Sequence, residues 1–204
     1  MKNIIFDFGN VITTFDEEYV VSKFTSAKEE QKFLIDEVIH APEWGVYGLI
    51  DTGYLTHEAI VNIINDRTNN QYKDLVIDFM NNFNEYRYFQ EGVLEIIKKL
   101  KKQGYKVYML SNTNEVSYEK FIKDIEYLFD GLVLSYQIHL IKPYEAIYKY
   151  LLEKYNLKPE ESLFIDDREV NMKTAHKFGI KGRTVRPDDV EDIKKVLEEY
   201  GIGD

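Results

Sequence analysis

The sequence contains no cysteine among its 204 residues. This absence excludes thiol catalysis, a zinc site held by cysteine and a disulfide framework, and it suits a reducing compartment. Long apolar runs are also absent, because no stretch approaches the roughly 18 residues that a membrane span needs. The apolar stretch at residues 4–6 stops at Asp7 and is too short for the core of a signal peptide. We therefore expect a cytoplasmic protein that has no membrane partner.

Positive charge is in short supply. The 26 lysines and arginines are outnumbered by 36 aspartates and glutamates, which gives a formal net charge of -10 at pH 7. Proteins that bind a nucleic-acid backbone gather positive charge on one face, whereas the acidic excess here is spread along the chain. We therefore expect a charged soluble surface and no nucleic-acid partner. Neither a heptad pattern nor a long apolar stripe indicates an assembly, so a monomer or weak dimer is expected.

The order of apolar segments predicts an α/β fold. Short apolar runs that end in polar residues are typical of strands buried on both faces. The clearest are residues 3–8, 106–110 and 162–165, and weaker ones are residues 131–135 and 181–185. Helical patterns lie between and after them, at residues 91–103, 143–155, 169–178 and 188–200. Strands that alternate with helices predict a doubly wound, mostly parallel sheet, with Pro143 at the first position of its helix.

Residues 14–88 break this alternation, because they lack a convincing strand. They are predicted to form helices at residues 17–26, 28–40, 57–66 and 73–87, with Thr56 as the N-cap of the third helix. We call residues 14–88 the helical insert, and residues 1–13 and 89–204 the core. An insert that follows the carboxyl end of the first strand lies over the usual ligand crevice of a parallel sheet, so we expect it to act as a lid.

Polar side chains follow the predicted strands. Asp7 ends the first strand, Ser111 and Asn112 follow the second, and Asp166 and Asp167 end the fourth. Carboxylates can hold Mg²⁺ together with waters and phosphate oxygens, and Asp is a known nucleophile in phosphoryl transfer. A hydroxyl and backbone N–H groups of these loops can hold the other phosphate oxygens. Lys142, before a helix, would add positive charge, so the set predicts phosphoryl chemistry.

Four segments carry a resemblance to a known family. They are Asp7-Phe8-Gly9-Asn10-Val11, Leu110-Ser111-Asn112-Thr113-Asn114, Lys142-Pro143 and Phe164-Ile165-Asp166-Asp167. In this order they resemble the four motifs of the haloacid dehalogenase superfamily, over the whole chain, and the helical insert resembles that superfamily's small helical cap. The residues in these motifs are most similar to those of bacterial sugar phosphatases such as α-D-glucose-1-phosphate phosphatase. The resemblance implies a Rossmann-like core and a Mg²⁺ cofactor.

The resemblance also implies a role for each motif residue. Asp7 would be the nucleophile and a metal ligand, and the carbonyl of Gly9 a second ligand. Asp166 would hold Mg²⁺ directly, and Asp167 would either be a ligand itself or contact a ligand. The phosphoryl group would be bound at Gly9, Asn10, Ser111, Asn112 and Lys142, where the lysine also stabilises the charge between nucleophile and phosphate. Asn171 would orient the fourth motif.

Gly9 departs from the superfamily's usual phosphatase pattern. Most resembling phosphatases carry a second Asp at this position, which protonates the leaving alkoxide and later activates water. General acid–base catalysis is typically worth about 10²–10⁴-fold in rate. We therefore expect slow turnover, an acid supplied by the insert or by water, or a leaving group of low pKa such as an anomeric hydroxyl. Candidate substrate contacts in the insert are Asp16, Trp44, Tyr47, Tyr54 and His57.

The sequence thus predicts a Mg²⁺-dependent hydrolase of small phosphate monoesters, with sugar phosphates favoured, that works through an aspartyl-phosphate intermediate. A non-catalytic protein that binds a phosphorylated metabolite is the alternative that Gly9 supports. A haloacid dehalogenase is a further alternative with the same nucleophile, but such enzymes need no metal and lack the acidic pair at Asp166 and Asp167.

Overall fold

The computed structural model describes residues 1–40 and 45–203. Within these residues five strands form a single sheet in which every neighbouring pair is parallel. The strands are β1 (Asn3–Phe6), β2 (Lys106–Ser111), β3 (Gly131–Leu134), β4 (Ser162–Asp166) and β5 (Lys181–Thr184). Their order is β3-β2-β1-β4-β5, so the direction of winding reverses at β1. Ligands bind at such a reversal, beyond the carboxyl ends of the strands, which is where Asp7 lies.

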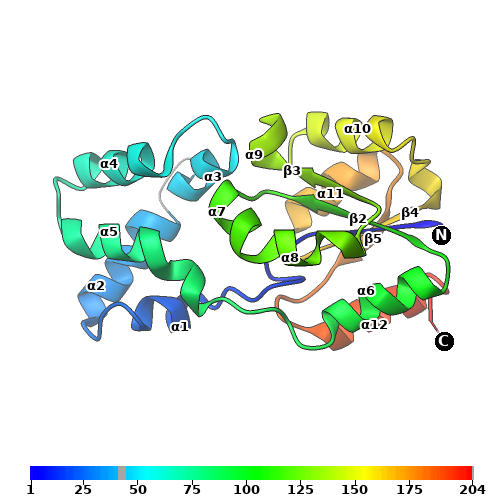
Figure 1. Cartoon of the computed structure of the whole chain (residues 1–204), viewed down its shortest axis with the longest axis horizontal. Coiled ribbons are helices and arrows are strands. Elements are labelled where there is room, and N and C mark those ends of the chain that lie inside the picture. The colour runs from blue at the N-terminus through cyan, green and yellow to red at the C-terminus, as the bar shows by residue number, and fades with distance from the viewer. Residues whose placement is uncertain (41–44, 204) are drawn as a thin grey trace.

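Helices cover both faces of the sheet, which confirms the doubly wound α/β prediction. On one face, α6 (Val93–Lys102) and α12 (Val190–Glu199) pack against the strand side chains that include Ile4 and Phe6. On the other face, α10 (Glu145–Lys154) and α11 (Glu169–Lys177) pack around Ile5. Every residue of β1 is therefore buried, because successive side chains point to opposite faces of the sheet. Figure 1 shows α6 and α12 together on the side of the sheet away from α10.

The segment before α10 differs from its prediction. The helix begins at Glu145, with Tyr144 as its N-cap, so Pro143 lies in a turn and not at the first helical position. The Tyr144 N–H donates to the carbonyl oxygen of Ile141 at 3.1 Å, which closes this turn. The prediction from Pro143 was correct that a helix lies nearby but wrong about the helix's first residue, which is Glu145.

The remaining helices connect the strands or build the insert. In the insert they are α1 (Glu17–Ser22), α2 (Lys28–Phe33) with its π-helical continuation η1 (Leu34–Ile39), α3 (Gly45–Asp51), α4 (His57–Arg67), and α5 (Lys73–Asn82) with the 3-10 turn η2 (Phe83–Tyr86). In the core they are α7 (Glu115–Ser117), η3 (Tyr118–Ile122), α8 (Lys123–Ile125), η4 (Glu126–Leu128), α9 (Ser135–Ile138) and η5 (Pro159–Glu161). None of the helices in the described part of the chain is long and apolar enough to cross a membrane.

The insert has a hydrophobic core of its own. Val20, Leu34, Ile60, Ile64 and Phe79 are fully buried within it, and they come from four short helical segments, α1, η1, α4 and α5. The predicted N-cap is confirmed, because the Thr56 hydroxyl accepts a hydrogen bond from the Ala59 N–H at 3.1 Å. The helix α3 lies in a stretch that the periodicity left without a predicted element. Figure 1 shows the insert helices gathered at one end of the molecule and the sheet at the other.

The loop after α3 docks the insert onto α9 of the core. The carbonyl oxygen of Thr52 lies 2.8 Å from Nδ1 of His139, and the ring of Tyr54 stacks on the same histidine with centroids 4.4 Å apart. Gly53 lies between them with a φ of +70°, and a Cβ added there would lie 2.3 Å from the carbonyl oxygen of Tyr136. This approach therefore requires glycine for both its backbone conformation and its lack of a side chain.

Replacing Gly53 by alanine tests this docking. Gly53→Ala places a side chain in the left-handed region, which costs about 1–2 kcal/mol, and also forces the loop away from α9. Gly201→Ala is the matched control, since Gly201 has the same φ of +70° but nothing within 4 Å of an added Cβ. Urea denaturation should therefore show a larger loss of unfolding free energy for Gly53→Ala than for Gly201→Ala. Equal losses would show that the contact with α9 contributes nothing.

Candidate active site

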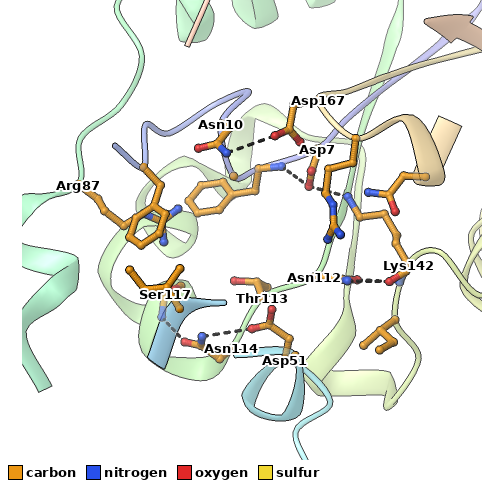
Figure 2. A pocket seen from close by; sticks show the side chains of 18 of the residues that line it. Asp7, Asn10, Asp51, Arg87, Asn112, Thr113, Asn114, Ser117, Lys142 and Asp167 are labelled. Carbon is orange, nitrogen blue, oxygen red and sulfur yellow. Dashed lines mark hydrogen bonds and ion pairs between the residues drawn. The ribbon is translucent and has the colours of Figure 1, made fainter. Parts of the chain in front are cut away.

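A cavity of about 670 Å³ lies between the carboxyl ends of the strands and the insert. The core side of its lining includes Asp7, Gly9, Asn10, Asn112, Lys142, Asp167 and Asn171. The insert side includes Phe15, Glu17, His40, Gly48, Asp51 and Phe83. Figure 2 shows these groups arranged around one space, with Asp7, Asp167 and Lys142 close together and Asp51 across from them. Polar groups from distant parts of the chain thus meet where the strand order predicts a ligand site.

Lys142 occupies the centre of the charged groups. Its ammonium nitrogen lies 2.7 Å from Oδ1 of Asp7 and 2.8 Å from Oδ2 of Asp166. All three side chains are buried, with exposed fractions of 3% for Lys142, 7% for Asp7 and 0% for Asp166. Buried carboxylates are strongly destabilising unless they are paired with positive charge and hydrogen-bonded. The lysine therefore makes it possible for two acidic groups to lie together at the end of the sheet.

The backbone of Lys142 is held by the side chain of Asn112. The Lys142 N–H donates to Oδ1 of Asn112 at 2.7 Å, and Nδ2 of Asn112 donates to the Lys142 carbonyl at 2.9 Å. Both ends of the amide are thus engaged, so a phosphoryl contact at Asn112 would have to use its backbone N–H. Ser111 is fully buried and its hydroxyl donates to the Asn112 carbonyl at 3.2 Å. The phosphate-binding roles of Ser111 and Asn112 stay predictions.

Three carboxylates form a group that fits a divalent cation. Asp7, Asp166 and Asp167 each offer an oxygen, and these oxygens lie within 4.8 Å of one another. An all-oxygen set of this kind suits Mg²⁺, which prefers hard ligands and retains waters. Neighbouring groups fix two of the acids: Nδ2 of Asn171 donates to both oxygens of Asp166 at 3.0 Å, and Nδ2 of Asn10 donates to Oδ2 of Asp167 at 3.2 Å. The contact of Asn171 with Asp166 agrees with the expectation that Asn171 orients the fourth motif.

The electrostatic setting of Asp7 also favours a cation nearby. Burial raises the pKa of Asp7 to about 8, although the neighbouring Lys142 opposes this change, and the charges of Asp166 and Asp167 add to it. A nucleophilic carboxylate must be ionised, and a nearby positive charge favours the ionised form. A divalent cation held by the three acids would therefore make Asp7 a better nucleophile at neutral pH.

The insert supplies residues that sequence reasoning missed. Asp51 is the last residue of α3 and its Oδ1 accepts a hydrogen bond from Nδ2 of Asn114 at 3.3 Å. Arg87 donates to the Thr13 hydroxyl at 2.8 Å and to the Thr14 carbonyl at 3.3 Å, so it secures the junction of the insert and the core. Neither residue belongs to a motif or a periodic pattern, so only the position of the insert over the crevice pointed towards them.

The structure does not bring the substrate contacts predicted in the insert together at the cavity, as far as its described residues show. The Tyr54 ring and the His57 ring, which lies 3.0 Å from Oδ1 of Asn81, are not among the residues that line the cavity in the described part of the chain. Asp16 is the N-cap of α1, where its side chain accepts from the Tyr19 N–H. Trp44 lies outside the described residues, as does the side chain of Tyr47. Their substrate contacts stay predictions.

Comparison with known proteins agrees with the fold. A family model described as a haloacid dehalogenase-like hydrolase matches residues 1–179. The chain therefore belongs to the haloacid dehalogenase-like hydrolases, and the resemblance seen in the four motifs is confirmed. Among its curated relatives is a D-ribitol-5-phosphate phosphatase from Bacteroides thetaiotaomicron, which is 27% identical over 212 residues, covering 97% of each chain.

Solved structures give the same result. A haloacid dehalogenase family enzyme from Bacteroides thetaiotaomicron, crystallised with magnesium and inorganic phosphate, has a TM-score of 0.70 at 27% identity, covering 93% of this chain and 96% of that one. An L-2-haloacid dehalogenase from Xanthobacter autotrophicus has a TM-score of 0.64 at 14% identity, covering 100% of this chain and 85% of that one. At that identity the likeness concerns the fold alone.

The contact between Asn171 and Asp166 gives a test of the metal site. Asn171→Ala removes the side-chain donor to both oxygens of Asp166, and loss of such an outer contact typically weakens metal binding by about 10–100-fold. The Mg²⁺ concentration that gives half of the maximal increase in the thermal unfolding midpoint should rise by the same factor. Asn82→Ala is the control, because the Asn82 side chain donates a hydrogen bond to Asp78 on the exposed surface of α5. An unchanged Mg²⁺ midpoint for Asn171→Ala would contradict the assignment.

Proposed function

We propose that the protein hydrolyses small phosphate monoesters, with Asp7 as the nucleophile and Mg²⁺ as the cofactor. The observation that carries this proposal is the buried arrangement of Asp7, Lys142 and Asp166, with the lysine 2.7 Å and 2.8 Å from the two carboxylates and with Asp7 and Lys142 lining the cavity. A carboxylate, a positive charge and oxygen atoms that suit a divalent cation thus lie close together. The names of the relatives and the magnesium and phosphate bound to a solved neighbour agree with it.

The proposed reaction follows from the chemistry of these groups. An oxygen of Asp7 attacks the phosphorus, the ester oxygen leaves, and the resulting aspartyl-phosphate is then hydrolysed by water. Lys142 neutralises charge that would otherwise keep an anionic ester away from an anionic nucleophile. Asp7, Asp166, Asp167 and the carbonyl of Gly9 would hold Mg²⁺, which supplies further charge neutralisation and Lewis acidity when bound. Backbone N–H groups of the Asn10 and Asn112 loops would hold the phosphate oxygens.

The cavity supports a small polyol or sugar phosphate as the substrate. Its volume of about 670 Å³ is within the usual range for small-molecule sites. The insert contributes both apolar rings, Phe15 and Phe83, and polar groups, Glu17, His40 and Asp51, and a mixed lining of this kind suits a molecule with carbon faces and hydroxyl edges. A relative named for a sugar-alcohol phosphate aligns over 97% of both chains. The cytoplasmic location and the monomeric or weakly dimeric state stay predictions.

A second candidate function has one observation in its favour. Gly9 offers no acid beside the nucleophile, so a protein that binds a phosphorylated metabolite without turning it over would also have this site. The dehalogenase alternative has less support, because the acids Asp166 and Asp167 meet Asp7 in a group that suits a metal, which that reaction does not need.

Phosphate release separates these functions. The wild type and Asp7→Asn should be assayed with a panel of sugar, sugar-alcohol and anomeric phosphates, with Mg²⁺ and with a chelator. We expect release that requires both Mg²⁺ and Asp7, because the amide is not a nucleophile. Thermal stabilisation by the same compounds is the control for binding. Stabilisation without release above the Asp7→Asn level from every compound would favour the binding protein and contradict the hydrolase.

A further inference from the structure

The site lacks an acid next to its nucleophile and has room where that acid would be. A Cβ added at Gly9 would meet nothing within 4 Å, so the glycine leaves open space and is not forced by close packing. A leaving alkoxide of ordinary pKa needs a proton as the ester bond breaks. Another residue that reaches the same cavity can supply this proton in place of the missing acid.

Only a few carboxyl groups line the cavity within the described residues: Asp7, Glu17, Asp51 and Asp167. Asp7 is the proposed nucleophile, and Asp167 is in the group that would hold the metal. Glu17 is already paired, since its Oε2 lies 2.7 Å from Nε2 of His40. Asp51 remains, and the described residues provide its Oδ1 with a hydrogen bond from Asn114 and its Oδ2 with none.

The position of Asp51 suits a donor to the leaving group. In phosphoryl transfer the attacking and leaving oxygens lie roughly in line on opposite sides of the phosphorus. An ester attacked by Asp7 from the floor of the cavity therefore directs its leaving oxygen towards the insert. Figure 2 shows Asp51 on that side, across the cavity from Asp7 and Asp167.

Core contacts hold Asp51 in place. Asn114, which donates to Asp51, is only 8% exposed, and its Oδ1 accepts from the Ser117 N–H at 3.0 Å as the N-cap of α7. Both ends of the Asn114 amide are thus fixed, one by the core and one by the insert. The loop that follows Asp51 docks on α9 through Thr52 and Gly53. The carboxyl group is therefore positioned by the closed arrangement of insert and core.

The surroundings of Asp51 also favour a protonated carboxyl group. Burial raises its pKa to about 7, while the hydrogen bond from Asn114 and the charges of Arg87 and Lys142 oppose this change. An acid whose pKa is near the working pH can give up a proton in one step and take one back in the next.

We propose that Asp51 is the general acid and base of the reaction and replaces the side chain that Gly9 lacks, an inference that rests on the proposed phosphatase function. In the first step Asp7 forms a bond to phosphorus, the ester P–O bond breaks, and the leaving oxygen takes its electron pair and the proton of Asp51. In the second step Asp51 accepts a proton from water, whose oxygen attacks phosphorus. The Asp7–phosphorus bond then breaks, which restores the carboxylate and releases inorganic phosphate.

Pre-steady-state kinetics with substrate in excess over enzyme test this assignment. The substrates are p-nitrophenyl phosphate, whose leaving group needs no proton, and butyl phosphate, whose leaving group does; neither carries a hydroxyl that Asp51 could bind. We expect Asp51→Asn to retain a rapid burst of about one equivalent of p-nitrophenol followed by slow turnover, because water activation is lost. Butyl phosphate cleavage should fall by about 10²–10⁴-fold. Asp51→Glu, which keeps the acid, should restore part of this loss.

Each other outcome has a distinct meaning. Glu17→Gln, the matched change at the other carboxyl group that the insert contributes, should leave the ratio of the two rates as in the wild type. If Asp51→Asn slows the burst and butyl phosphate cleavage equally, or slows neither, the proposal is wrong. If the wild type cleaves neither compound nor any sugar phosphate, the phosphatase function itself has failed. Thermal unfolding of Asp51→Asn, with a midpoint near that of the wild type, shows that the variant is folded.

Discussion

The ion pairs of Lys142 are the interaction on which the rest of the site depends. One buried ammonium group lies within 2.8 Å of two buried carboxylates, Asp7 just after β1 and Asp166 at the end of β4. Removing such a partner leaves uncompensated charge in a low dielectric, which is strongly unfavourable. The lysine therefore determines that β1 and β4 can end in acids side by side, and that a third acid, Asp167, can complete a group suited to a cation. Asn112 fixes the lysine backbone and Asn171 fixes Asp166, so the position of the charge is set by contacts on both sides.

The site divides its chemistry between the core and the insert. The core contributes the proposed nucleophile, a buried positive charge and the proposed metal ligands, all near the carboxyl ends of parallel strands. The insert contributes apolar rings and the Asp51 carboxyl group, which Asn114 holds at the cavity next to the loop that docks on α9. In this division the proposed acid is Asp51 of the insert, which would replace the side chain that Gly9 of the core lacks. A reaction that needs both parts requires the insert to lie over the carboxyl ends of the strands, as it does in this structure.

Sequence reasoning reached much of this arrangement for physical reasons. The strands were predictable because parallel strands buried on both faces need short continuous apolar runs, as in β1 and β4, and Thr56 was predictable because an N-cap has a local signature. Asp7, Asp166 and Asp167 were expected to meet because strand ends share one edge of the sheet. Asp51 could not be predicted, since its role depends on how the insert docks, which no local pattern encodes. Asn112 was expected to bind the phosphoryl group, but only the three-dimensional arrangement shows that its side-chain amide holds the Lys142 backbone.

The central claim is that Asp7 becomes covalently phosphorylated. Its most direct test is to quench the enzyme while it turns over a sugar phosphate in the presence of Mg²⁺. Any acyl phosphate is then reduced with borohydride, and the product is mapped by peptide mass spectrometry. The account predicts conversion of Asp7 to homoserine, with no conversion in protein that was not given substrate. Phosphate release with an unmodified Asp7, or with the modification at another carboxyl group such as Asp51, would contradict it.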